Sequence, residues 1–482
     1  MLDRRRTLLT FLATSIALFM VSLDNLVVTT ALPVIRADLH ANLAQLEWTV
    51  NAYTLTFAVL LLTGAALGDR FGRKRLFTIG VGVFTAGSAL AALSPNGDVL
   101  VVARAIQGLG AAIVMPLTLT ILSSAVPAER RGLALGLWGG ISGLAIAVGP
   151  LVGGAIVAGL DWHWIFWLNV PVGIALVPFA MVALRESHGP DAALDLPGLA
   201  LVSGGLFALV WALIHGNGDG WTSPGILAAF AVAVVLLPLF LLRQARAAHP
   251  MLPLRFFRNR AFSAANAVSF LMSFGVFGAI FLLAQFFQLV QGYSPFDAGL
   301  RTLPWTGMPI LVAPLAGILS DRIGGRPLLV AGMALMAVGL GWFAVASSPS
   351  VPYVDLAPAL VIAGVGMSLF FAPTANLVLS SVRPGEEGLA SGANNTIREV
   401  GGVFGVAILA SVFSANGGYA TPQSFVEGLT PALWLGAAVV AAGAAVALVI
   451  PGRRRPVIAL DLPARPAVGE LAGVREAVEP GR

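Results

Sequence analysis

Two charged residues lie inside long apolar stretches, where a lone charge is unfavourable. Asp24 falls late in the first apolar stretch, and Arg104 falls early in the fourth. A charge costs roughly 3 kcal/mol or more in a bilayer unless it faces a partner or a cavity, so both are candidate functional groups. If the two stretches are helices that cross a membrane in opposite directions, a rise of ~1.5 Å per residue brings both charges to the same half of it. We therefore predict that they meet and that Asp24 is a protonatable carboxylate whose protonation depends on whether Arg104, water or substrate lies beside it; a static buried ion pair is the alternative.

A second pair of charges occurs in the later part of the chain. Arg398 and Glu399 adjoin each other in another apolar stretch. Neighbours on a helix point about 100° apart, so these two need not pair with each other. Glu399 is either a second site for a proton or a cation, or a carboxylate that neighbouring helices satisfy.

Composition indicates which elements carry these charges. Hydrophobic residues make up 57% of the 482 residues and charged residues only 11%, which is typical of a membrane protein. Apolar runs recur along the chain, and they must be helices because lipid offers the backbone no hydrogen-bond partners. Since each run is long enough to cross a hydrocarbon core of ~30 Å, we place spans at about 8–32, 46–68, 76–94, 99–122, 133–158, 164–184, 197–215, 225–243, 262–290, 299–320, 327–347, 355–381, 388–415 and 430–450.

Basic residues mark alternate loops between these spans. One set of loops carries nearly all of the arginines, whereas the other carries mainly acids, among them Asp38, Asp98 and Asp161. By the positive-inside rule, the basic loops and both termini are cytoplasmic, which requires an even number of spans. Residues 452–482 are polar and lack apolar periodicity, so we predict a disordered cytoplasmic tail.

Two sequence blocks return later in the chain in the same order. LGDRFG at 67–72 returns as LSDRIG at 319–324, and SSAVPAE at 123–129 returns as SSVRPGE at 380–386. Parallel halves of this kind are a known transporter plan, with a binding site between them. We therefore expect an all-α integral membrane protein with an N-terminal six-helix bundle at 1–190, two extra transmembrane helices at 191–254 and a C-terminal six-helix bundle at 255–451.

The first of these blocks, extended to residue 75, resembles the signature loop of the major facilitator superfamily, G-x-L-x-D-R-x-G-R-K, with Ala65 at the first glycine. An aspartate at a helix end beside arginines can dock against helix termini and neighbouring charges, forming a latch that breaks when the halves rock. A topology anchor made of arginines is the alternative. The latch residues are Asp69, Arg70, Gly72, Arg73, Asp321 and Arg322.

The fifth span resembles the pattern that marks exporters in this superfamily, G-x-x-x-x-x-G-P-x-x-G-G. Glycines along one helix face allow close helix contact and a proline bends the helix, which suits a seam that forms and reforms between states. Ordinary glycine-rich membrane packing is the alternative. The seam residues are Gly143, Gly149, Pro150, Gly153 and Gly154.

Further blocks, around Asp24, Arg104 and Arg398, resemble the 14-helix drug:proton antiporter branch of the superfamily. The resemblance implies the superfamily fold with 14 transmembrane helices and multidrug efflux, in which a lipophilic or cationic small molecule leaves as protons enter. Our candidates for proton coupling are Asp24, Arg104, Arg398 and Glu399, the last of which stands where the branch pattern commonly has glutamine. The resemblance also implies a substrate cavity with Asn51, Tyr53, Gln107 and Asn395.

This interpretation predicts a monomeric protein of the bacterial inner membrane that uses a proton gradient and no cofactor. Its partners are a small-molecule substrate, protons and the lipid bilayer, and it binds no nucleic acid. Dedicated export of one metabolite, such as a self-made antibiotic, is one alternative, and a non-transporting membrane sensor or scaffold is another. An enzyme is disfavoured, because the sequence has no cysteine and no phosphate loop, metal-ligand cluster or nucleophile with a base.

Overall fold

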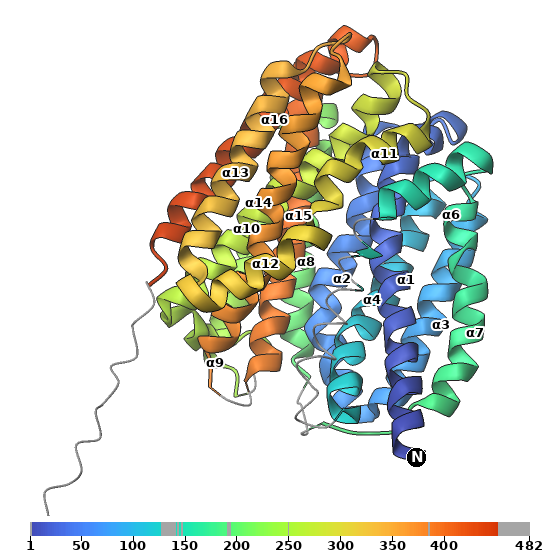
Figure 1. The fold of residues 1–482 in the computed structure, drawn as a ribbon, viewed down its shortest axis with the longest axis vertical. Coiled ribbons are helices and arrows are strands. Elements are labelled where there is room, and N and C mark those ends of the chain that lie inside the picture. Colours follow the sequence, from blue (N-terminus) through green and yellow to red (C-terminus); the bar gives the residue numbers. More distant parts are fainter. Residues whose placement is uncertain are drawn as a thin grey trace, which may run out of the picture. The chain divides into compact units, whose positions relative to one another are not determined.

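The computed structural model describes residues 2–126, 141, 144–145, 148–189, 194–248, 250–383 and 386–451. Within these residues, 13 helices are long and apolar enough to cross a membrane, and a shorter apolar helix, Val148–Gly159, lies where the fifth span is predicted. The chain up to Pro451 forms one compact unit, in which the helices run largely alongside one another (Figure 1). The all-α membrane fold is therefore confirmed. The predicted tail at 452–482 lies outside the described residues.

Two helices in the first half of the chain begin at polar caps. Asn42 and Gln45 form a capping box at the start of the second helix, and Asn96 accepts a hydrogen bond from the Val99 amide at the start of the fourth. Such caps satisfy amide groups that have no partner within the helix. The helices of this half are α1 (Leu2–Asp38), α2 (Leu43–Phe71), α3 (Arg73–Ala92), α4 (Gly97–Ala125), α6 (Trp164–Trp167) and α7 (Asn169–Ala183).

Two further helices, α8 (Leu196–Asp219) and α9 (Pro224–Arg246), join the first half to the second. Asp195 caps α8, because its carboxylate accepts a hydrogen bond from the Gly198 amide. The second half then contains η1 (Leu254–Arg258), α10 (Arg260–Gln285), η2 (Phe286–Val290), α11 (Pro295–Thr306), α12 (Met308–Ile323), α13 (Gly325–Ala346), α14 (Tyr353–Ser380), α15 (Glu387–Asn416) and α16 (Pro422–Leu448).

Several predicted spans differ from the observed helices in their bounds, among them the tenth and the last. The span predicted at 299–320 starts at Pro295 and is divided at Gly307 into α11 and α12. The last helix starts at Pro422 rather than at about residue 430 as hydropathy suggested. The cause is local, because the Thr421 hydroxyl accepts a hydrogen bond from the Ser424 amide and proline is favoured in the first turn of a helix.

Helix α8, one of the two extra helices, packs against other helices of the bundle. Its residues Val210 and Ile214 share one apolar cluster with Leu55 of α2 and Val403 of α15. The Asn217 amide of α8 also donates hydrogen bonds to the backbone and side chains of α15. Helix α8 therefore packs against both halves of the protein. Helix α9 beside it is mostly exposed, since only 17% of its apolar stretch is buried.

The two ends of the helical unit differ in charge. Helices α2, α7, α9 and α12 finish at one end, beside basic residues that include Arg73 and Arg243; we call this the arginine-rich end. The other end carries Asp38, Asp98 and Asp355, and we call it the acidic end. In Figure 1 the chain starts at the lower, arginine-rich end, and α6 and α11 lie near the acidic end above. The separation follows the predicted alternation of the loops.

Candidate functional site: a buried charge network

Asp24 of α1 and Arg104 of α4 form an ion pair inside the first half. Arg104 Nη1 lies 2.5 Å from Asp24 Oδ2, and the two residues are 3% and 0% exposed. The predicted contact is therefore present. Removing one partner of such a pair leaves an uncompensated buried charge, which typically costs about 3–5 kcal/mol.

Two amides complete the surroundings of the Asp24 carboxylate. Asn169 Nδ2 donates to Asp24 Oδ1 at 2.7 Å, and Gln107 Nε2 donates to the same oxygen at 3.1 Å. Gln107 Nε2 also lies 2.6 Å from Ser88 Oγ. Three donors thus converge on one carboxylate and hold it in place.

The guanidinium of Arg104 is held by α2 as well as by α1. Its Nε donates to the Thr49 carbonyl at 3.1 Å and its Nη1 donates to Gln107 Oε1 at 2.8 Å. The group stacks over the Tyr53 ring at 4.3 Å, while Nη2 has no hydrogen-bond partner among the described residues. Tyr53 and Gln107, predicted to line a cargo cavity, therefore belong to the shell of the charge pair. We call the assembly of Asp24, Arg104, Gln107, Asn169 and Tyr53 the Asp24 network.

Sequence reasoning missed Asn169, a member of this network, and Ser88, which contacts the network through Gln107. Asn169 begins α7 directly after an aromatic run, and Ser88 lies in the apolar α3. A polar residue isolated in an apolar helix is a signal for both. The partner of each, however, lies on another helix and has no fixed sequence spacing.

The second charge pair differs from the first. Arg398 Nη2 lies 3.1 Å from Glu399 Oε1, so the two neighbours pair even though their positions point apart on α15. The length of the arginine side chain allows this. Glu399 is 5% exposed, and its Oε2 has no partner among the described residues. Asn395, one turn earlier, is half-buried.

The loop predicted to be a latch binds a segment of its own half. Asp69 Oδ1 accepts from Arg73 Nε at 2.8 Å, and the Asp69 carbonyl accepts from the Gly189 amide at 3.0 Å. Glu186, which the sequence interpretation overlooked, accepts from the amides of Lys74 at 2.9 Å and Arg75 at 3.2 Å. The Glu186 carboxylate thereby caps α3, where a negative charge is favoured. A latch between the two halves stays a prediction.

The two copies of the repeated loop share one backbone geometry. Gly72 and Gly324 both have positive φ angles, 103° and 85°. Each donates its amide to the carbonyl four residues earlier, at 3.1 Å to Gly68 and 2.9 Å to Ser320. Glycine is suited to this conformation because it lacks Cβ. Arg70 lies over the Phe71 ring, Arg322 lies in the last turn of α12, and the Asp321 side chain lies outside the described residues.

The exporter pattern places glycines where helices touch. A Cβ on Gly149 would lie 2.8 Å from Leu26 Cβ of α1, and a Cβ on Gly153 would lie 2.7 Å from the Val27 carbonyl oxygen of the same helix. A Cβ on Gly154 would lie 2.3 Å from the Pro295 carbonyl of α11. The seam glycines therefore permit contact with both halves. Gly143 lies outside the described residues.

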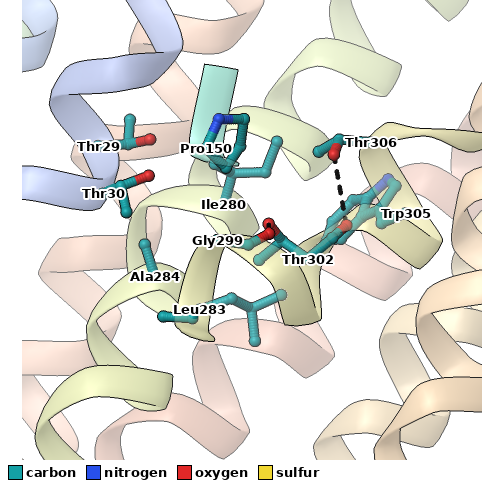
Figure 2. A pocket seen from close by; sticks show the side chains of 11 residues that line it. Thr29, Thr30, Pro150, Ile280, Leu283, Ala284, Gly299, Thr302, Trp305 and Thr306 are labelled. Atoms are coloured by element: carbon teal, nitrogen blue, oxygen red, sulfur yellow. Dashed lines mark hydrogen bonds between the residues drawn. The ribbon is translucent and has the colours of Figure 1, made fainter. Parts of the chain in front are cut away.

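Figure 2 shows the small pocket beside this seam. Thr29 and Thr30 of α1 lie on one side, Thr302 and Trp305 of α11 lie on the other, and Pro150 lies between. Its free volume is about 20 Å³, which holds about one water molecule. At this depth the two halves are thus nearly closed upon each other.

At the arginine-rich end, one carboxylate joins the two inserted helices. Burial raises the pKa of Asp195, but hydrogen bonds from Arg243, the Gly198 amide and Gln244 outweigh it and hold the pKa below its usual value. Arg243 Nε lies 2.5 Å and Gln244 Nε2 lies 2.7 Å from the carboxylate. Asp195 therefore fixes the start of α8 to the end of α9.

A membrane protein with repeated halves and a buried charge network has the make-up of a secondary transporter. The profile of the Major Facilitator Superfamily matches residues 14–406, with a second match over 302–475. The chain belongs to the Major Facilitator Superfamily, a family of membrane transporters.

Similar proteins that are named as resistance and export proteins support this assignment. The tetracenomycin C resistance and export protein of Streptomyces glaucescens is 36% identical over 88% of this chain and 79% of its own length. The multidrug resistance protein Stp of Mycobacterium tuberculosis is 36% identical over 85% of this chain and 76% of its own. The crystal structure of a peptide transporter, POT, matches with a TM-score of 0.67 over 92% of this chain and 94% of that one, at 15% identity. That last likeness concerns the fold alone.

Proposed function

We propose that this chain is a proton-coupled antiporter that exports lipophilic or cationic small molecules by alternating access. Efflux agrees with the relatives, which are named for multidrug resistance and for antibiotic resistance and export. The observation that carries proton coupling is the buried Asp24–Arg104 pair, because an ionisable pair inside a membrane helix bundle typically serves an ion or substrate pathway.

The Asp24 network suggests how a proton is exchanged. In the ionised state, Arg104, Asn169 and Gln107 all donate to the Asp24 carboxylate. A proton that enters from outside displaces one of these donors, and neutralisation weakens the tie between α1 and α4. Loss of this tie favours a different packing of the first half, which is the change that alternating access requires.

The moving parts follow from the sequence repeat. Residues 1–190 and 255–451 form the two bundles that rock, with 191–254 between them and the arginine-rich end in the cytoplasm of a bacterium. The protein acts as a monomer in the inner membrane, with both termini cytoplasmic, and a proton gradient takes the place of a cofactor. Asp69 and its repeat at Asp321 form the latch, and Glu399 with Arg398 forms a second ion site.

A second candidate function is dedicated export of one antibiotic. It is favoured by the relatives named for resistance to single compounds, tetracenomycin C and methylenomycin A. Export measured for a panel of chemically unrelated compounds separates the two, since a dedicated exporter transports one chemical class.

Proton coupling is tested with purified protein in liposomes that hold a pH-sensitive dye. Addition of transported compound should release protons with the wild-type protein and not with Asp24→Asn. The matched control is Asp219→Asn, at an exposed aspartate of the acidic end, which should behave as wild type. Full proton release by Asp24→Asn would refute the assignment of Asp24.

A further inference from the structure

Helix α2 carries two buried polar side chains, one turn apart, with atoms that have no hydrogen-bond partner in the described part of the chain. Glu47 is 2% exposed and Asn51 is 0% exposed. Among the described residues, Glu47 Oε2 and both polar atoms of the Asn51 side chain have no partner. Because the two residues are four positions apart, their side chains share one face of the helix. Buried polar groups usually have partners, so this face requires an explanation.

Glu47 is also exceptional among the buried acids. Of the carboxylates that are 5% exposed or less in the described residues, Asp24 pairs with Arg104 and Glu399 pairs with Arg398. Glu47 has no ion-pair partner within the same residues. The sequence interpretation passed over it because it lies at the predicted start of a span, where acids are ordinarily solvated.

The neighbours of Glu47 on α2 indicate where its face points. The Trp48 ring lies 5.4 Å from the Phe207 ring of α8 in a tilted arrangement, and Leu55 packs against helix α15. Tyr53 points elsewhere, to the Asp24 network. At ~100° per residue, Glu47 points between the direction that Trp48 and Leu55 share and the direction of Tyr53, on the side of α2 that faces away from α4. Helix α2 packs against α15 of the second half, so this face borders the region between the halves.

Contacts at the acidic end close over this region. The Arg36 guanidinium of α1 stacks over the ring of Tyr419 at 3.7 Å, and the Tyr419 hydroxyl donates to Gln285 Oε1 of α10 at 2.7 Å. Burial raises the pKa of Tyr419, the Arg36 cation lowers it and Glu47 raises it. Glu47 is therefore within electrostatic reach of Tyr419, yet the nearby arginine stacks on the ring instead of pairing with the carboxylate.

We propose that Glu47 and Asn51 form a recognition site for the protonated amine of an exported molecule. The carboxylate supplies the counter-charge and the Asn51 amide oxygen supplies a hydrogen-bond acceptor, which together suit a group with one charge and several N–H donors. The inference rests on the proposed export function and adds a class of cargo to it.

The Asp24 network makes a poor competitor for this amine. Its carboxylate already accepts three hydrogen bonds from the protein. Glu47 has unused acceptor capacity, so a cationic cargo gains more by binding there. Proton exchange at Asp24 and amine recognition at Glu47 are thus assigned to different carboxylates.

The test compares two compounds that differ in one charge. Daunorubicin carries a protonated amine, whereas N-acetyldaunorubicin is neutral and otherwise alike. Transport of each is measured by fluorescence in liposomes containing wild type, Glu47→Gln, Asn51→Ala or Glu427→Gln. Glu427 is exposed at the acidic end, so Glu427→Gln is the matched control for the removal of a carboxylate charge.

Glu47→Gln should lower daunorubicin transport about tenfold or more and leave N-acetyldaunorubicin within about twofold of wild type. Asn51→Ala should show the same pattern with a smaller loss, and Glu427→Gln should match wild type for both compounds.

Three other results overturn the inference, and they are distinguishable. Equal export of both compounds by wild type and Glu47→Gln leaves the export function intact and removes Glu47 from recognition. Loss of both compounds in folded Glu47→Gln assigns Glu47 to coupling instead. Absence of export of either compound by wild type refutes the proposed function for this cargo class and the amine site with it.

Discussion

The two halves of the protein each hold a buried acid beside an arginine, but they hold it in different ways. In the first half, Asp24 and Arg104 come from different helices, and two amides also donate to the carboxylate. In the second half, Arg398 and Glu399 are neighbours on one helix, and one Glu399 oxygen has no partner in the described residues. The first pair therefore ties helices together, whereas the second can change partners without disturbing the packing.

The largest difference in stability is expected between variants of the two arginines, Arg104 and Arg398. Arg104→Ala leaves Asp24 buried and unpaired, so the free energy of unfolding should fall by about 3–5 kcal/mol. Arg398 has a side chain that is 24% exposed, but Glu399 is buried, so Arg398→Ala should lower that free energy by a smaller amount, about 1–3 kcal/mol. Thermal unfolding of both variants in the same detergent measures the contrast. Equal decreases in the free energy of unfolding would mean that the two pairs contribute equally to stability.

A smaller effect on stability is expected from variants that change the surroundings or the charge of the two acids and keep both arginines. Glu399→Gln should fold as well as wild type, because Glu399 Oε2 contributes no bond, and should release fewer protons when cargo is added. Asn169→Ala, which removes one donor from Asp24, should instead shift the pH dependence of transport without removing it. Stopped-flow measurement of proton release across a pH series distinguishes them. An unchanged pH profile for Asn169→Ala would show that this amide does not govern proton exchange.

The repeated loops offer a third comparison. Gly72→Ala and Gly324→Ala both force a side chain into a positive-φ conformation, which costs about 1–2 kcal/mol. Gly72→Ala should lower the free energy of unfolding by more than this, because its Cβ would also lie 2.7 Å from the Glu186 carboxyl carbon. Glu186→Gln, which keeps the shape of the cap, serves as the control. A decrease of only about 1–2 kcal/mol for Gly72→Ala would contradict this account.

The smallest effect is expected at the inserted helices, where Asp195 holds α8 to α9. The pKa of Asp195 is lowered in the folded protein, so its contribution to stability is present above the unfolded pKa of about 4 and is lost as pH falls through the folded value. Asp195→Asn should therefore lower stability at neutral pH by about 1 kcal/mol and flatten the decline on acidification. Thermal unfolding from pH 7 downwards, about one unit at a time, tests this; parallel curves for variant and wild type would exclude it.

The sequence predicted the helical membrane fold, because long apolar runs have one stable solution in lipid. It also predicted that Asp24 meets Arg104, since the depth of a residue in a membrane helix follows from counting. The repeated loop was visible as well, and Gly72 and Gly324 share its backbone geometry. Each of these properties depends on order and spacing along one helix.

Tertiary structure alone decided which side chains surround the charges. Asn169, Ser88 and Glu186 reach partners on other helices, and hydropathy does not specify how helices rotate against each other. The same reason separates Gln107 and Tyr53, which turn into the Asp24 network, from Asn51, which turns out of it. The depth of a residue in the membrane follows from the sequence of its own helix. The direction in which its side chain points follows from the packing of all the helices.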